Sequence, residues 1–310
     1  MSFRVSLARL GASKSISLLV LMACSAGLIA NTPAADHARA AGDTQQTTQV
    51  SSAARILPPS EHYRFPAHQA YFYDADWHLL NAGTARLTME SSPQGQHAVV
   101  SADTTGFVNL LFAVHDSFRT TINPRNFCSL ALSKRTQEGS RRRETEVHYD
   151  YAHGKSLLQE KDLRTGAVKH VEHPIPGCVT DTMSGFYYVA SLPLSQGANY
   201  TFPLNDGGAT GEITATVEGR EQVKTPAGRF PTVRVRAIAT GGPLKNKGRV
   251  WVWYSDDGQR IPVQLKAKVK WGTLTVRLTR VERQIRRPNT VSSSHKERRK
   301  KGSSSTIRPK

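Results

Sequence analysis

Regular alternation of apolar and polar residues constrains the fold of this chain more than any other feature. A period of two is expected where one face of a β-sheet is buried and the other is wetted. Between Glu212 and Val281, strand-like segments of this kind are separated by clear turns. The sequence therefore predicts an antiparallel sheet. The clearest alternating positions are Ile261, Val263, Leu265, Ala267 and Val269.

Other segments predict further strands and few helices. Leu79 to Glu90 alternates in the same way, whereas Phe107 to Val114 fits either a short helix or a buried strand. Lys134 to Arg143 is basic and typical of a turn-rich crossing between strands. The best helix candidate is Asp181 to Leu192, with Asp181 as N-cap and Pro193 beyond its end.

The N-terminus has the order of charge and apolar residues that is typical of a secretory signal. Basic residues precede an apolar run from Ile16 to Ala23. Cleavage after Ala40, Ala26 or Ala30 fits the small residues present. In an alternative interpretation, Leu21 to Cys24 resembles a lipobox and Cys24 is lipidated, although Met22 departs from that pattern. The chain is therefore predicted to be exported to the periplasm or cell envelope, free or anchored as a lipoprotein.

Export changes the expectation for the two remaining cysteines. Once the leader is removed, Cys128 and Cys178 are the only thiols, and they enter an oxidising compartment. A disulfide between them is predicted, and two buried free thiols are the alternative.

The formal charge of +18 is concentrated at the C-terminus, where residues 286–310 carry nine basic residues and one acid. This segment has too few apolar residues to fold and is predicted to be a disordered basic tail. Export argues against nucleic acid as its partner. An anionic envelope surface is the predicted partner, and a solubilising tail without a partner is the alternative. The predicted organisation is a leader over 1–40, a flexible spacer over 41–57, one β-rich domain over 58–285, and the tail.

The segment Val250 to Tyr254 is apolar on both faces, unlike its neighbours. Core packing explains such a strand. Alternatively, Trp251 and Trp253 line the concave side of a curved sheet and bind an apolar ligand.

No motif for catalysis, metal or cofactor binding stands out. The sequence contains no Gly-x-Ser-x-Gly, P-loop, Cys-x-x-Cys, or dinucleotide-binding glycine pattern. His170 and His173 point to opposite faces of an extended chain, so they do not predict a metal site. We therefore name no catalytic residue, no metal ligand and no cofactor.

Aromatic, proline and glycine landmarks follow one another along the chain, including Phe127-Cys128-Ser129, Ile175-Pro176-Gly177-Cys178, Ser184-Gly185-Phe186-Tyr187-Tyr188 and Val252-Trp253-Tyr254-Ser255. Together they resemble the bacterial exported family known as domain of unknown function 3108. The resemblance spans about Arg64 to Arg283 and implies an envelope protein with no established catalytic residues. With the alternating strands, it predicts a mainly β fold: a large curved antiparallel sheet, half-barrel or sandwich-like, with one or two short helices.

Two classes of function fit these observations. In the first, the protein is a non-catalytic binding or carrier module for a hydrophobic or amphipathic envelope molecule such as a lipid. In the second, it is an envelope polysaccharide hydrolase or modifying enzyme that uses carboxylates. A roomy apolar cavity favours the first class, and converging carboxylates favour the second.

Overall fold

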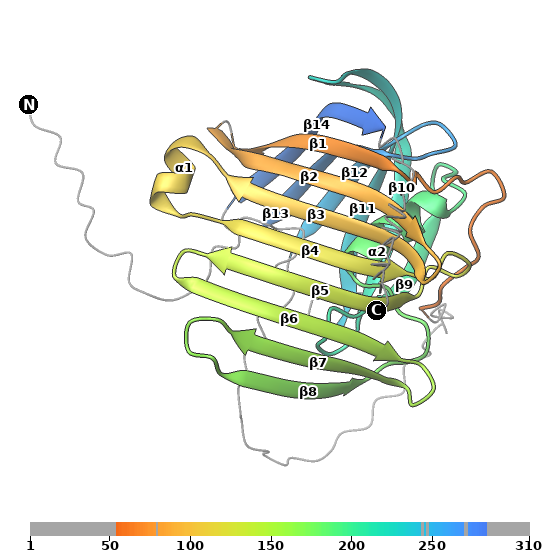
Figure 1. Cartoon of the computed structure of the whole chain (residues 1–310). Helices are drawn as coiled ribbons and strands as arrows, with labels where there is room; N and C mark the ends of the chain where they lie inside the picture. The colour runs from red at the N-terminus through yellow and green to blue at the C-terminus, as the bar shows by residue number, and fades with distance from the viewer. Residues whose placement is uncertain (1–53, 79, 243–244, 246–247, 270–271, 284–310) are drawn as a thin grey trace, which may run out of the picture.

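The computed structural model describes residues 54–78, 80–242, 245, 248–269 and 272–283. In these ranges the chain forms fourteen strands and two helices, α1 (Gly106–Leu111) and α2 (Thr182–Ser191) (Figure 1). The strands are β1 (Gln69–Trp77), β2 (Leu80–Ser92), β3 (Gly95–Thr104), β4 (His115–Ile122), β5 (Ser129–Glu138), β6 (Arg141–Asp150), β7 (Lys155–Asp162), β8 (Val168–Pro174), β9 (Asn199–Leu204), β10 (Gly211–Thr225), β11 (Gly228–Gly241), β12 (Arg249–Ser255), β13 (Pro262–Val269) and β14 (Gly272–Arg283).

All fourteen strands belong to one antiparallel sheet. Its order is β8-β7-β6-β5-β4-β3-β2-β1-β14-β13-β12-β11-β10-β9, so β1 and β14 join the two halves of the chain. The edge strands β8 and β9 do not pair with each other, and the sheet is not closed. Figure 1 shows β1–β8 in front and β9–β13 behind, with α2 between the two layers. The predicted curved antiparallel sheet is confirmed, in its half-barrel form.

Alternation explains which face of each strand is buried. On β13, Val263, Leu265 and Ala267 are buried and the residues between them are not, as the sequence predicted. The buried face continues onto the neighbouring strands, because Leu265 on β13 lies opposite Val276 on β14, and Val276 lies opposite Ala75 on β1. The core is therefore the concave side of the sheet together with α2.

Helix α2 begins where the sequence predicted. The side chain of Asp181 accepts hydrogen bonds from the backbone N–H groups of Met183 and Ser184, and the Ser184 hydroxyl accepts one from the Asp181 N–H. This reciprocal pair is a capping box, which satisfies N–H groups left free at a helix start. Within the described residues, neither helix has the length and apolar character needed to cross a membrane.

The Asp181 carboxylate also fixes α2 to the sheet. Its Oδ2 accepts hydrogen bonds from the hydroxyls of Thr120 on β4 and Ser129 on β5, the latter at 2.6 Å. On the other side, the Tyr254 hydroxyl on β12 donates to the Phe186 carbonyl at 2.9 Å. Burial raises the pKa of Asp181, and nearby Asp206 adds to this effect, whereas the hydrogen bonds oppose it.

The segment Lys134 to Arg143 is not the turn-rich crossing that its charge suggested. It forms the turn end of the β5–β6 hairpin, and the turn is confined to Gly139 and Ser140. Lys134 points inward, where its Nζ lies 3.4 Å from an Asp206 carboxylate oxygen, and both side chains are buried. An ion pair with a distant residue therefore allows a basic side chain in the core.

Cys128 and Cys178 form the predicted disulfide, with 5.2 Å between their Cα atoms. The bond joins the segment before β5 to the segment before α2. Cys24, the leader and the basic tail lie outside the described residues, as does most of the expected spacer.

We predict that Asp181→Ala lowers the free energy of unfolding by about 3–5 kcal/mol, because it removes a helix cap and leaves buried hydroxyls without an acceptor. Denaturant titration followed by circular dichroism measures the change. Asp162→Ala is the matched control, since the Asp162 carboxylate bonds two backbone N–H groups in an exposed turn and should matter much less. Equal losses in the two variants would contradict the role given to Asp181.

Replacing both cysteines by serine should destabilise the protein by roughly 4 kcal/mol, the entropy cost of freeing a loop of about 50 residues. Urea titrations of the variant and of the wild type with and without reductant test this. The reduced wild type should match the variant. Two titratable thiols in denatured, unreduced protein would rule out the bond.

Candidate functional site

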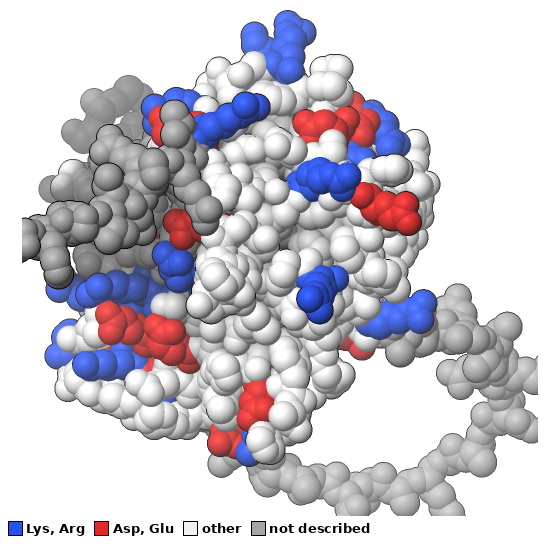
Figure 2. Space-filling view, turned by 45° about the vertical axis from the view of Figure 1, so that its right-hand side comes forward, with Lys and Arg blue, Asp and Glu red and all other residues white. Residues whose placement is uncertain are grey.

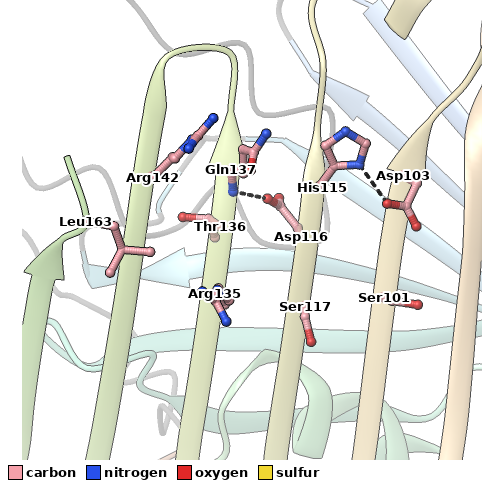
Figure 3. A pocket seen from close by; sticks show the side chains of 10 residues that line it. All are labelled: Ser101, Asp103, His115, Asp116, Ser117, Arg135, Thr136, Gln137, Arg142 and Leu163. Carbon is pink, nitrogen blue, oxygen red and sulfur yellow. Dashed lines mark hydrogen bonds and ion pairs between the residues drawn. The ribbon is translucent and has the colours of Figure 1, made fainter.

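A hollow on the described surface lies where the strands β3 to β6 end, near α1. Its volume is about 570 Å³, and it is broadly open to solvent. Ten residues from β3, β4, β5, β6 and the turn after β7 line it, and nine of the ten are polar (Figure 3). We call it the polar hollow.

The polar hollow forms where β4 and β5 separate. Regular pairing runs from Ile122↔Ser129 to Ser117↔Arg135 and resumes only as the single bridge Val114↔Glu138. In the gap, the Gln137 N–H donates to Oδ1 of Asp116 at 3.0 Å. A side-chain carboxylate thus takes the place of a ladder carbonyl, as Figure 3 shows.

Asp116 is an unusual carboxylate in this position. Its side chain faces the concave side, is only 3% exposed, and has an Oδ2 with no hydrogen-bond partner among the described residues. Burial raises the pKa of Asp116 to about 7. The Gln137 N–H opposes the shift, and the nearby carboxylates of Glu138 and Asp103 add to it.

The accessible part of the hollow is rich in hydrogen-bond donors and charge. His115 Nδ1 lies 2.8 Å from Oδ1 of Asp103, and both side chains are about half exposed. Arg135 is largely exposed and lies 3.5 Å from a Glu144 oxygen, whereas Arg142 has no ion pair among the described residues. Such a surface suits a polar group with anionic or hydroxyl oxygens.

No group of three or more His, Cys, Asp or Glu residues within the described ranges could hold a metal ion. His170 and His173 lie on the edge strand β8, with exposed or partly exposed side chains.

Helix α1 places an apolar surface beside the polar hollow. It lies in the connection from β3 to β4, between Asp103 and His115 of the hollow, and none of its residues is buried. Phe107, Leu110 and Leu111 are 68%, 81% and 69% exposed, and Leu80 on β2 is 65% exposed. We call these four side chains the apolar patch.

The two tryptophans predicted to bind a ligand lie elsewhere. Because Tyr254 faces α2, alternation along β12 turns Trp253 and Trp251 to the opposite face. Trp253 is buried, and its Nε1 donates to the Glu221 carboxylate at 2.8 Å, whereas Trp251 is partly buried. The two side chains therefore do not line the concave side as expected, and their role in ligand binding stays a prediction.

Sequence reasoning singled out neither Asp116 nor the exposure of α1. Asp116 looks like an ordinary strand residue, and its burial follows from the gap between β4 and β5. The spacing of 107, 110, 111 and 114 predicts either a short helix or a buried strand, and the structure forms the helix, with its large apolar side chains exposed.

The sequence resemblance noted above is shown by a family model described as "Protein of unknown function (DUF3108)", which matches residues 72–279. A search of curated proteins found no match.

A search of solved structures found several matches, and of the following three only the first has a TM-score above 0.5. A β-barrel-like protein of Brucella abortus from another family of unknown function, DUF1849, has a TM-score of 0.51 at 9% identity, over 74% of this chain and 99% of its own. A Bacteroides fragilis protein assigned as exported, with a YmcC-like fold, scores 0.28 at 9% identity, over 71% and 98%. A Parabacteroides distasonis protein assigned as a lipoprotein scores 0.30 at 11% identity, over 71% and 98%.

We predict that Asp116 makes the protein less stable as pH rises from about 4 to about 7. In this window the folded state keeps the Asp116 proton, because its pKa is about 7, and the unfolded state has lost it. The contribution of protonated Asp116 to the free energy of unfolding is fully present below pH 4 and is lost as pH rises through 7. Solvent near the hollow should limit the change to the order of 1–2 kcal/mol.

The measurement is the difference in unfolding free energy between wild type and Asp116→Asn at several pH values. Asparagine keeps the acceptor for Gln137 but does not titrate, so other carboxylates cancel in the difference. A difference that stays flat from pH 4 to 8 would contradict the raised pKa.

Proposed function

This chain belongs to the DUF3108 family, and we propose that it is an exported, non-catalytic binding module of the cell envelope for an amphipathic molecule such as a lipid. One observation carries the proposal: a solvent-open polar hollow lies directly beside an exposed apolar surface. The N-terminal leader supports export.

The polar hollow supplies the contacts for the polar part of the ligand. His115, Arg135 and Arg142 offer N–H donors at its surface, and Ser101 and Ser117 add hydroxyls. A guanidinium group pairs well with phosphate or carboxylate oxygens. We therefore propose an anionic or hydroxyl-rich head group in the hollow.

The apolar patch supplies the contacts for the hydrocarbon part. Covering one exposed leucine or phenylalanine side chain with hydrocarbon gains about 1.5–3 kcal/mol. Phe107, Leu110 and Leu111 together thus provide a substantial gain, and they need no rearrangement of the core because α1 has no buried residue.

The carboxyl groups of the hollow favour a second candidate, a polysaccharide-modifying enzyme. Asp103 and Asp116 both line the hollow, and burial raises the pKa of Asp116 to about 7, which suits a general acid. Binding ranks first because the free oxygen of Asp116 is buried, whereas a general acid must reach its substrate.

We predict that protein purified under native conditions carries a lipid detectable by mass spectrometry. Arg135→Glu with Arg142→Glu should reduce the amount bound about tenfold or more, since an attractive charge pair becomes repulsive. Arg229→Glu is the control, because Arg229 is exposed at the opposite end of the sheet and should retain binding.

The binding proposal fails if no lipid copurifies and lipid extract added to the protein does not bind. Turnover of an envelope polysaccharide that is lost in Asp116→Asn would instead favour the enzyme.

A further inference from the structure

Exposed large apolar side chains are concentrated at one end of the sheet. Among the described residues only six such side chains exist, and five lie at the end where β1, β3, β5 and β7 finish. Four form the apolar patch, and Val168 at the start of β8 is the fifth. Val281 near the end of β14 is the exception, at 39% exposed. Monomeric proteins rarely concentrate exposed apolar groups unless the surface is covered in use.

The opposite end of the sheet is different. Figure 2 brings that side of the molecule forward and shows basic and acidic side chains scattered among neutral ones, without a large patch of one sign. Val281 is the one exposed large apolar side chain of the described residues that lies toward this opposite end, so the hydrophobic asymmetry is a property of the α1 end.

The apolar patch is held in place by hydrogen bonds. The Thr105 N–H donates to the Ala82 carbonyl at 3.1 Å, and the Thr105 hydroxyl donates to Asn81 at 3.0 Å, which ties α1 to β2 beside Leu80. At the other end of the connection, the Val114 N–H donates to the Thr104 hydroxyl at 2.9 Å. The four apolar side chains thus project from an anchored support.

Basic side chains flank this apolar surface. The Gly139 N–H donates to the Ala113 carbonyl at 2.8 Å, which places the β5–β6 turn against the end of the α1 segment. The next residues, Arg141 and Arg142, are exposed and form no ion pair within the described ranges. An uncharged apolar tip next to free arginines complements the acyl region and the anionic head groups of a lipid bilayer.

We propose that α1 and Leu80 form a membrane-docking element, which inserts into the acyl boundary of an anionic bilayer while Arg141 and Arg142 lie at the head groups. This inference deepens the proposed function, because docking brings the polar hollow to the surface from which an amphipathic ligand comes. Docking to the membrane does not require that the protein keep the ligand bound during purification.

The test is cosedimentation of the full chain with vesicles of phosphatidylglycerol and phosphatidylethanolamine, compared with phosphatidylcholine alone. The wild type should prefer anionic vesicles, and Leu110→Asp with Leu111→Asp should weaken binding about tenfold or more. Val281→Asp is the control, since it adds a charge at an exposed apolar site away from α1. Arg141→Glu with Arg142→Glu should remove the preference for anionic lipid.

Salt separates this element from the basic tail. Binding through a solvated basic tail is screened at 0.5 M salt, whereas insertion of α1 should persist. Equal binding of wild type and the leucine variant at 0.5 M salt would overturn the inference. The inference would also be overturned if light scattering showed that the apolar patch joins two copies of the chain and the leucine variant bound vesicles as well as the wild type. Copurified lipid without vesicle binding would overturn docking alone, and vesicle binding without any bound ligand would overturn the proposed function alone.

Discussion

The buried carboxylate of Asp181 is the interaction on which the arrangement of this protein depends. A half-barrel has an open concave side, and here α2 fills it. The Asp181 carboxylate accepts hydrogen bonds from backbone N–H groups in the first turn of α2. It also accepts hydrogen bonds from Thr120 on β4 and Ser129 on β5, which join the helix to the sheet. A buried carboxylate without these donors would raise the free energy of the folded state. The start of α2 and the placement of β4 and β5 therefore depend on each other through this one side chain. The Cys128–Cys178 bond holds the same junction covalently.

Much of this fold could be predicted because its causes are local. Alternation along β13 and the cap at Asp181 are readable from neighbouring residues, and the leader-like N-terminus predicted the bond between Cys128 and Cys178. The β5–β6 hairpin could not be predicted in the same way. Lys134 looks solvated in the sequence, and it is buried only because Asp206, 72 residues away, pairs with it. Long-range compensation of charge leaves no local signal.

The candidate site was less predictable for a related reason. The sequence directed attention to Trp251 and Trp253, since aromatic residues on both faces of a strand suggested a ligand surface. In the structure both side chains face away from α2, and Trp253 donates a hydrogen bond to Glu221 on β10, so neither lines the concave side. Conversely, the apolar spacing of Phe107, Leu110 and Leu111 is identical for a buried and an exposed helix. Only the position of α1 beyond the end of the sheet distinguishes the two.

The polar hollow and the apolar patch have a common origin. A two-residue turn would let β3 return directly as β4, but the connection here contains α1 and closes where Thr104 meets Val114. Immediately after that closure, β4 fails to pair with β5, and Asp116 bonds Gln137 in place of a backbone carbonyl. One inserted segment therefore exposes apolar side chains on one side and opens the ladder on the other. Val114, which closes the α1 segment through Thr104, lies two residues before Asp116, so we expect a ligand or membrane that moves α1 to change the environment of Asp116 as well.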